Sequence, residues 1–279
     1  MNIGCFALVA PFQPLAAQLA QIQAMGFAHA DVTDNTDGAC LGVEFGFTAL
    51  ASLDANPHDL KRLFEKHGIT PTSFCAHANL LDPSAPWRYG TAQIIKAVRA
   101  AAAMGLEHVI TTEGEPKTRF GESLSEDEQI FAIAEKLAEP LRVAEDFGVK
   151  LLFEPHGPVS TSIAKTGRVL DRCDSHALAL NLDTGNCWLG GTDPVDYVKA
   201  FGSKIEHVHW KDMPAEMEPE RGQRFGCGMA TIPLGDGSVG IPAIVQALKA
   251  SGFDGDTTLE IAGEEAVQTS AARLREWWG

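Results

Sequence analysis

The chain has 279 residues, of which 45% are hydrophobic and 21% charged, enough to build a large folded core. Its 37 acidic and 22 basic side chains give a net charge of −15 at pH 7, without a cluster of lysines or arginines. Such a surface repels phosphate backbones, so we expect no nucleic-acid partner. The N-terminal apolar run is too short for a signal peptide or a membrane span, and the six cysteines lack CxxC spacing. We therefore expect a cytoplasmic protein with reduced cysteines and no membrane contact.

Short apolar or β-branched runs alternate with longer segments of helical periodicity along the whole chain. Eight runs are predicted as strands: residues 2–9, 29–34, 70–77, 108–114, 149–156, 178–185, 204–212 and 256–263. Glycines in MGF, HGI, MGL, FGV and SGF shortly precede several of these strands, where they would end the helices. Eight strand–helix pairs predict an α/β protein with a single (β/α)₈ TIM-barrel domain over residues 1–279. A doubly wound sheet is the alternative, but APFQP follows the first strand instead of a glycine-rich phosphate loop.

Functional residues of such a barrel lie at the C-terminal ends of its strands. Four consecutive predicted strands end in polar residues that would meet there: Glu154, Asp183, His209 and Glu260. Buried carboxylates are costly unless they share a counter-charge. Three carboxylates and one imidazole favour a divalent cation, Mn²⁺ first, with Mg²⁺, Co²⁺ or Zn²⁺ as alternatives. The other interpretation is that each residue separately caps a loop or forms an ion pair.

Further polar residues near the strand ends are candidates for binding a substrate. They are His77, Glu113, His156, Asn186, His207, Lys211, Arg221 and Arg224. The alternatives are loop capping for His77 and Glu113, a structural role for His156, contact with a metal ligand for His207, and contact with solvent or a carboxylate for Lys211. Residues 213–235 form a long connection after the seventh strand, which we expect to close over the barrel mouth as a lid, with a surface excursion or a dimer arm as the alternative.

The order of the motifs FEPHG, NLDTGN, HVHWKD and TLEIAG resembles the xylose isomerase-like barrel superfamily. That superfamily includes keto-sugar 3-epimerases, hydroxypyruvate isomerase-like proteins, inosose dehydratases and endonuclease IV. In its sugar-acting members, residues on strands five to eight hold one metal ion, and these positions fall on Glu154, Asp183, His209 and Glu260. Many epimerases read DTGH where this chain has Asn186, and they often carry an Arg after the strand-seven His where this chain reads MPAEME.

The resemblance and the residues together imply a divalent-metal-dependent isomerase or epimerase acting on a small keto sugar or polyol derivative. Glu154 and Glu260 would be the catalytic residues, transferring a proton next to a metal-bound carbonyl. The alternative is a lyase acting on a cyclic keto substrate, an inosose or a 3-keto-glycoside. The absence of the DTGH motif favours this lyase over an epimerase. An abasic-site endonuclease is disfavoured by the charge of the chain, and a non-catalytic sugar-binding barrel by the intact ligand set. We expect a small-molecule sugar partner and a homo-oligomer.

Overall fold

The computed structural model describes residues 1–10, 12–33, 51–82, 89–116, 118–228 and 230–279. Eight parallel strands pair in chain order and close into a barrel, which confirms the predicted fold. They are β1 Asn2–Phe6, β2 His29–Thr33, β3 Thr70–Cys75, β4 His108–Thr111, β5 Lys150–Phe153, β6 Leu178–Asp183, β7 Ile205–Trp210 and β8 Asp256–Leu259. Each strand ends one to four residues before the predicted run does, so Glu154 and Glu260 directly follow β5 and β8, whereas Asp183 and His209 lie within β6 and β7.

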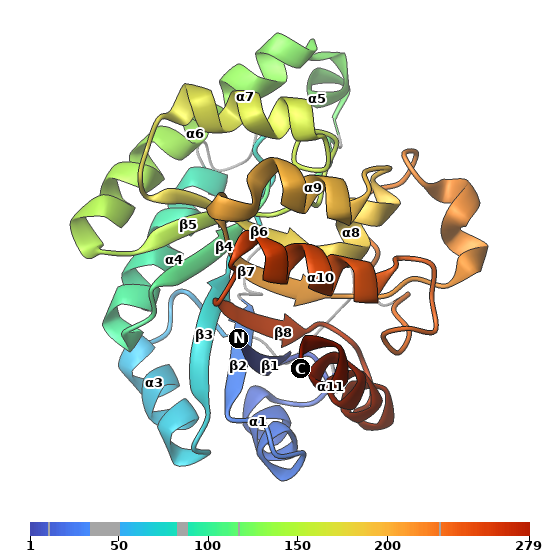
Figure 1. Ribbon diagram of the computed structural model, residues 1–279. Coiled ribbons are helices and arrows are strands. Elements are labelled where there is room, and N and C mark those ends of the chain that lie inside the picture. Colours follow the sequence, from blue (N-terminus) through green and yellow to red (C-terminus); the bar gives the residue numbers. More distant parts are fainter. Residues whose placement is uncertain (11, 34–50, 83–88, 117, 229) are drawn as a thin grey trace.

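Helices surround the barrel as an outer layer, and the two chain ends lie near each other beside β1 and α11 (Figure 1). The described helices are α1 Leu15–Ala24, α3 Pro57–Lys66, α4 Tyr89–Met104, α5 Arg119–Ser123, α6 Glu126–Phe147, α7 Ile163–Cys173, α8 Thr184–Leu189, α9 Pro194–Phe201, η1 Gly202–Lys204, η2 Ala215–Glu220, α10 Ile241–Ser251 and α11 Glu264–Trp278. Local sequence sets the ends of these helices. For example, α6 begins with a capping box between Ser125 and Glu128 and ends at Gly148 in the left-handed conformation.

The strands bury both of their faces, as expected for a parallel sheet covered by helices. One face packs with the helices into a large apolar core, to which Val109, Leu151 and Phe153 belong. The other face contributes a smaller, separate apolar cluster formed by Phe6, Leu8, Cys75, Ile110, Leu152 and Ala179. Because successive side chains of a strand point to opposite sides, this smaller cluster lies inside the barrel and forms the floor of whatever site opens above it.

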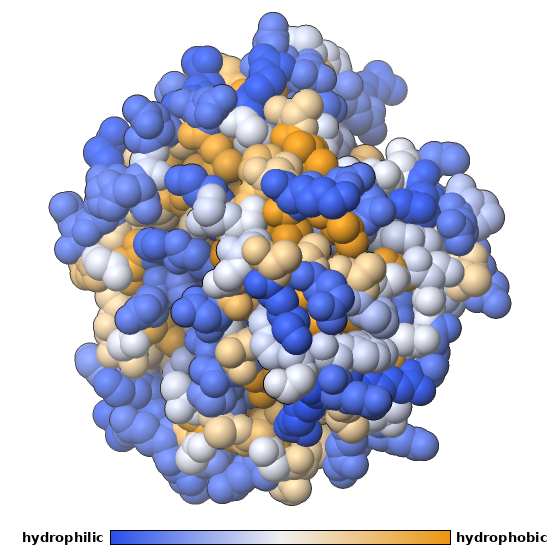
Figure 2. Space-filling view, in the orientation of Figure 1, coloured by the Kyte–Doolittle hydropathy of each residue, from blue (hydrophilic) through white to orange (hydrophobic). Residues whose placement is uncertain are grey.

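Polar side chains cover much of the molecular face seen in Figure 2, with smaller apolar areas between them. This distribution agrees with a chain that carries 59 charged residues of the Asp, Glu, Lys and Arg types, 37 acidic plus 22 basic. Among the helices that the structure describes, none is long and apolar enough to cross a membrane.

Candidate metal centre

Polar side chains lie directly above the smaller apolar cluster inside the barrel. Ile110, Leu152 and Ala179 lie side by side on β4, β5 and β6. Residues two positions further along a strand point to the same side, so the strand alternation directs Glu154 and Asn181 inward above this layer. The inward residues that gather here from β3, β5, β6, β7 and β8 are His77, Glu154, Asn181, Asp183, His207, His209 and Glu260.

The structure brings the four predicted metal ligands together. Glu154, Asp183, His209 and Glu260 each offer one ligand atom, and these atoms all lie within 4.8 Å of one another. His209 stands between two of the acids, with Nδ1 3.4 Å from Glu154 Oε2 and 3.2 Å from Glu260 Oε2. Burial alone would lower the pKa of His209, but the charge of Glu154 and the contacts with Asp31 and Cys75 raise it well above its usual range.

Unpartnered atoms in this cluster test whether the residues fit a cation. Glu154 Oε1, Glu260 Oε2 and His209 Nδ1 are buried and have no hydrogen-bond partner among the described residues. Leaving such atoms unpaired is costly, whereas coordination of a cation would satisfy them together. The set contains three carboxylates and one imidazole, a combination suited to hard or borderline divalent ions. The residues present therefore fit a divalent metal.

Lys211 lies at the edge of the same cluster and is almost completely buried. Its Nζ is 2.7 Å from Asp183 Oδ2 and 2.8 Å from Glu260 Oε1. Burial lowers the pKa of Lys211, but Asp183 and Glu260 outweigh that effect and raise it well above its usual range. Burial also raises the pKa of Asp183, which reaches about 7 because Glu260 and Glu154 oppose the effect of Lys211. Lys211 is thus a built-in positive charge for two of the candidate ligands.

Asp31 on β2 is a buried member of this site that sequence reasoning missed. Its Oδ2 accepts hydrogen bonds from His209 Nε2 at 3.0 Å and from the Thr258 hydroxyl at 2.7 Å. The Thr72 hydroxyl donates to the other carboxylate oxygen. Burial would raise the pKa of Asp31, but His207 and His209 lower it well below its usual range. The available signal was a charged residue between Ala30 and Val32, inside a strand that should be buried on both faces.

Asn181 on β6 is a second residue that sequence reasoning missed. Its Nδ2 donates to Glu154 Oε2 at 3.2 Å, and its Oδ1 is 3.0 Å from His207 Nδ1, which acts as the donor. His207 therefore lies beneath the candidate metal centre, hydrogen-bonded to Asn181 and with Nε2 3.3 Å from Asp31 Oδ2. Asn181 stands two positions before Asp183 and so shares its face of the strand, which was the signal that could have revealed it.

His77 contacts Glu154, and His156 lies next to His77. His77 Nε2 is 3.2 Å from Glu154 Oε2, and the two imidazole rings are 5.3 Å apart. Burial lowers the pKa of His77, but Glu154 raises it more, so the net shift is upward. Burial lowers the pKa of His156 to about 4. Nδ1 of both rings is buried and has no hydrogen-bond partner among the described residues.

Glu113 is held by a loop and does not join the cluster. Its Oε1 accepts the backbone N–H groups of Val159 and Ser160, each at 2.8 Å, and Thr112 donates to its Oε2 at 3.0 Å. A Cβ atom at Gly157 would lie 2.6 Å from Glu113 Oε1, so the loop packs tightly against this carboxyl group. The geometry favours the loop-capping interpretation of Glu113 over the predicted substrate contact.

Asn186 is completely buried in α8, directly after the C-terminal end of β6. Its Nδ2 donates to Asp183 Oδ2 at 2.7 Å, and its Oδ1 accepts the backbone N–H of Cys227 at 2.8 Å. Both ends of the amide that was predicted to contact substrate are therefore used within the protein. Asn186 connects a candidate metal ligand to the connection after β7.

Arg221 and Arg224 also lie away from the four ligands. The Arg221 guanidinium stacks 4.7 Å from the Trp188 ring centre and donates to the Trp188 carbonyl at 3.0 Å. Arg224 pairs with Glu220 at 2.8 Å, and half of its side chain is exposed. The first arginine fastens the connection after β7 to α8, and the second lies on the surface of that connection.

Asp212 anchors the connection that was expected to act as a lid. Its carboxylate accepts four backbone N–H groups, at distances of 2.7 to 3.1 Å, from Met213, Gly235, Gly237 and Val239. A Cβ atom at Gly237 would lie 2.3 Å from Asp212 Oδ1, so a side chain cannot be added there without displacing the carboxylate. The two ends of the connection are thereby fixed next to each other.

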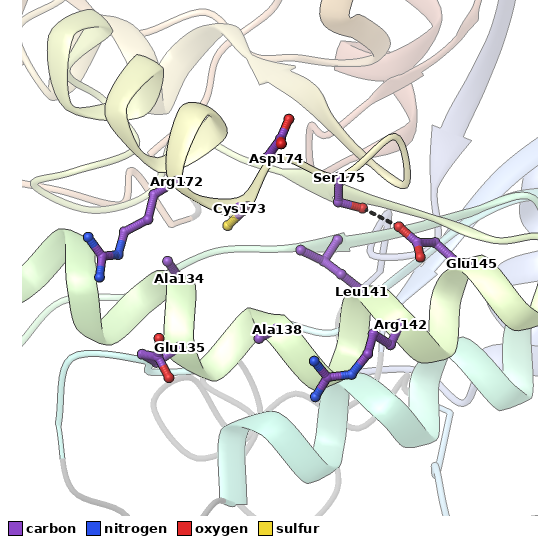
Figure 3. Close-up of a pocket in the computed structure, with 10 residues that line it drawn as sticks. All are labelled: Ala134, Glu135, Ala138, Leu141, Arg142, Glu145, Arg172, Cys173, Asp174 and Ser175. Carbon is purple, nitrogen blue, oxygen red and sulfur yellow. Dashed lines mark hydrogen bonds between the residues drawn. The ribbon is translucent and has the colours of Figure 1, made fainter.

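A surface groove of about 400 Å³ lies between α6 and α7, on the outer side of the barrel (Figure 3). Ser175 donates a hydrogen bond of 2.7 Å to Glu145 on one side of it. None of the residues that line this groove belongs to the cluster at the strand ends. The groove is therefore separate from the candidate metal centre.

Sequence comparison finds similarity to inosose dehydratases. The chain is 28% identical to the inosose dehydratase of Lacticaseibacillus casei over 131 residues, which are 44% of this chain and 44% of that protein. It is 25% identical to the inosose dehydratase of Clostridium perfringens (strain ATCC 13124) over 183 residues, 59% of this chain and 61% of that protein. The chain thus spans about half the length of the curated relatives that it matches.

Solved structures share the whole fold at low identity. The IolI protein with a bound zinc atom has a TM-score of 0.77 at 17% identity, covering 100% of this chain and 98% of its own. A D-tagatose 3-epimerase-like protein has a TM-score of 0.76 at 20% identity, covering 99% and 97%. Residues 19–277 match the family described as the xylose isomerase-like TIM barrel, so the chain belongs to that family.

Proposed function

We propose that the protein is a divalent-metal-dependent isomerase or epimerase that acts on a small keto sugar or keto-polyol by proton transfer next to the carbonyl group. The observation that carries this proposal is the meeting of Glu154, Asp183, His209 and Glu260 within 4.8 Å at the C-terminal ends of four barrel strands. The names of the relatives and of the structural neighbours support sugar chemistry.

Glu154, Asp183, His209 and Glu260 would hold the metal ion. When bound, the cation would supply Lewis acidity that makes a neighbouring C–H group more acidic. Mn²⁺ is our first choice because three of the four ligands are carboxylates, and Zn²⁺ is the second because the IolI structure carries a zinc atom.

Glu154 and Glu260 are the residues suited to moving the proton. Each has one oxygen held by basic or amide neighbours, while the other oxygen is buried without a partner in the described structure. His77 and Asn181 hold Glu154, and Lys211 holds Glu260. Both carboxylates approach Nδ1 of His209, and one would accept the proton while the other returns it.

A dehydratase is the second candidate, because the sequence relatives at 24–28% identity are named inosose dehydratases. Elimination begins with the same proton removal and differs only in the departure of a β-hydroxyl or alkoxyl group. The same residues serve both reactions, so the substrate decides between them.

A panel of keto sugars, inososes and 3-keto-glycosides in D₂O, followed by ¹H NMR with Mn²⁺ or Zn²⁺ added, tests the proposal. We expect deuterium at the carbon next to the carbonyl, with inversion or carbonyl migration for an isomerase and an unsaturated ketone for a dehydratase. Glu154→Gln and Glu260→Gln should each suppress exchange, because an amide does not accept the proton. Glu206→Gln, at the other end of β7, is the matched control. Full turnover in both site variants would refute the mechanism.

A further inference from the structure

We propose that Asp31 is a positioning residue that holds His209 in the one tautomer able to bind a divalent cation through Nδ1. The inference rests on the metal centre of the proposed function and extends it to a carboxylate on β2, a strand that contributes none of the four ligands. Asp31 and the acids Glu154 and Glu260 contact opposite nitrogens of the same imidazole ring.

The tautomer follows from the chemistry of the two partners. A cation that binds His209 displaces one ring proton, and the neutral imidazole then carries a proton on one nitrogen and a lone pair on the other. The Asp31 carboxylate accepts hydrogen bonds and lies 3.0 Å from Nε2, so the proton stays on Nε2. Nδ1 then presents its lone pair at 3.4 Å from Glu154 and 3.2 Å from Glu260, where the candidate ligand atoms converge. Histidines that bind metals generally donate their second N–H to such an acceptor.

Asp31 is itself held rigidly, which a positioning residue requires. Thr72 on β3 donates to one carboxylate oxygen, and Thr258 on β8 donates to the other. The three side chains come from three strands of the closed barrel, and Asp31 is fully buried. The barrel framework, and not a loop, therefore defines where the His209 ring lies.

Two further side chains, His207 and Asn181, lie between Asp31 and Glu154. Asp31 Oδ2 is 3.3 Å from His207 Nε2, and the opposite nitrogen of His207 is 3.0 Å from Asn181 Oδ1. Asn181 then turns its amide nitrogen toward Glu154 Oε2, 3.2 Å away. Asp31 thus orients His209 directly, while the hydrogen-bonded pair of His207 and Asn181 fills the space between Asp31 and Glu154.

Substitution of Asp31 combined with calorimetric titration of the metal-free protein with Zn²⁺ and Mn²⁺ tests the inference. Asp31→Asn preserves shape but offers an amide N–H that stabilises the opposite tautomer, so we expect cation affinity to fall about 10- to 100-fold. Glu206→Gln removes a carboxylate at the other end of β7, where it contacts His108 and Lys150, and should bind both ions like the wild type. An Asp31→Asn protein that folds and binds both ions with wild-type affinity overturns the inference.

Nitrogen-15 NMR of the wild-type protein reports the tautomer of His209 directly, so this test does not depend on whether the Asp31→Asn variant folds. In the zinc-loaded protein, we expect the proton of His209 on Nε2 and the metal-induced shift on Nδ1. A proton on Nδ1 would overturn the assignment. A wild-type protein that binds neither ion refutes the metal centre and this inference together. One that binds zinc with the expected tautomer but turns over no sugar refutes only the proposed reaction.

Discussion

Lys211 and Asp183 form a buried ion pair at the edge of the metal centre, with Nζ 2.7 Å from Oδ2. The same ammonium group reaches Glu260 at 2.8 Å, so one lysine neutralises part of the charge on two candidate ligands. These acids are therefore not left without a counter-charge when the metal is removed. The lysine and a divalent cation share the same carboxylates.

Replacing Lys211 by methionine should make the thermal stability of the protein depend more strongly on added metal. Removal of one partner of a buried ion pair commonly costs about 3–5 kcal/mol of folding free energy. We expect a lower Tm for Lys211→Met without metal, and a larger rise in Tm on adding Mn²⁺ or Zn²⁺ than in the wild type. Lys199→Met, which breaks an exposed pair with Asp196, is the control and should leave Tm nearly unchanged. Equal metal-free Tm values for wild type and Lys211→Met would contradict this view.

Glu113 should matter for folding and not for substrate affinity. Alanine at this position leaves the backbone N–H groups of Val159 and Ser160 buried without an acceptor, which costs about 1–3 kcal/mol. Glutamine retains an oxygen for both groups, so Glu113→Gln should unfold close to the wild type in urea. A Glu113→Ala protein with unchanged stability and a raised KM would instead support the substrate contact that the sequence suggested.

Asn186 should act on the metal centre through Asp183. The Asn186→Ala change removes a hydrogen bond of 2.7 Å to Asp183 and leaves the N–H of Cys227 without its acceptor. We expect weaker binding of Mn²⁺ or Zn²⁺ in calorimetry together with a lower Tm. A substrate contact would behave differently, raising KM while cation affinity stayed at the wild-type value.

The Glu206 carboxylate should stabilise the folded protein at neutral pH and lose this effect in acid. Burial raises the pKa of this carboxyl, but hydrogen bonds from His108 and Lys150 lower it below the usual 4.5. A lowered pKa in the folded state means that the pair stabilises the protein above pH 4.5 and loses this effect as the pH falls through the lowered pKa. The Tm difference between wild type and Glu206→Gln should therefore be largest near neutral pH and shrink below pH 4.5. The effect should be small because solvent reaches the pair, and a difference constant down to pH 3 would refute it.

The barrel and the ligand set could be predicted because each depends on local patterns. Alternating strand and helix periodicity gives the order of eight strands, and the topology alone then brings Glu154, Asp183 and Glu260 to one end. The order of the strands is therefore enough to predict that these residues, distant in the sequence, lie close together.

Asp31 and Glu113 show why the rest of the site was harder to predict. Whether a polar residue faces a ligand, a loop or another side chain depends on register between strands and on loop packing. Asp31 lies within its strand, and only the pairing of β2 with β1 and β3 places it beneath His209. Glu113 follows β4 as a ligand would, but the loop after β5 folds back and occupies its oxygens.

The pairing of β1 with β8 has a consequence for the order in which the centre is assembled. Asn2 pairs with Asp256 and Cys5 with Leu259, so the first and last strands meet only when almost the whole chain is present. Glu260 follows directly on that last strand. A chain emerging from the ribosome therefore carries Glu154, Asp183 and His209 for some time before Glu260 arrives, and the set of four candidate ligands is complete only when the ring closes.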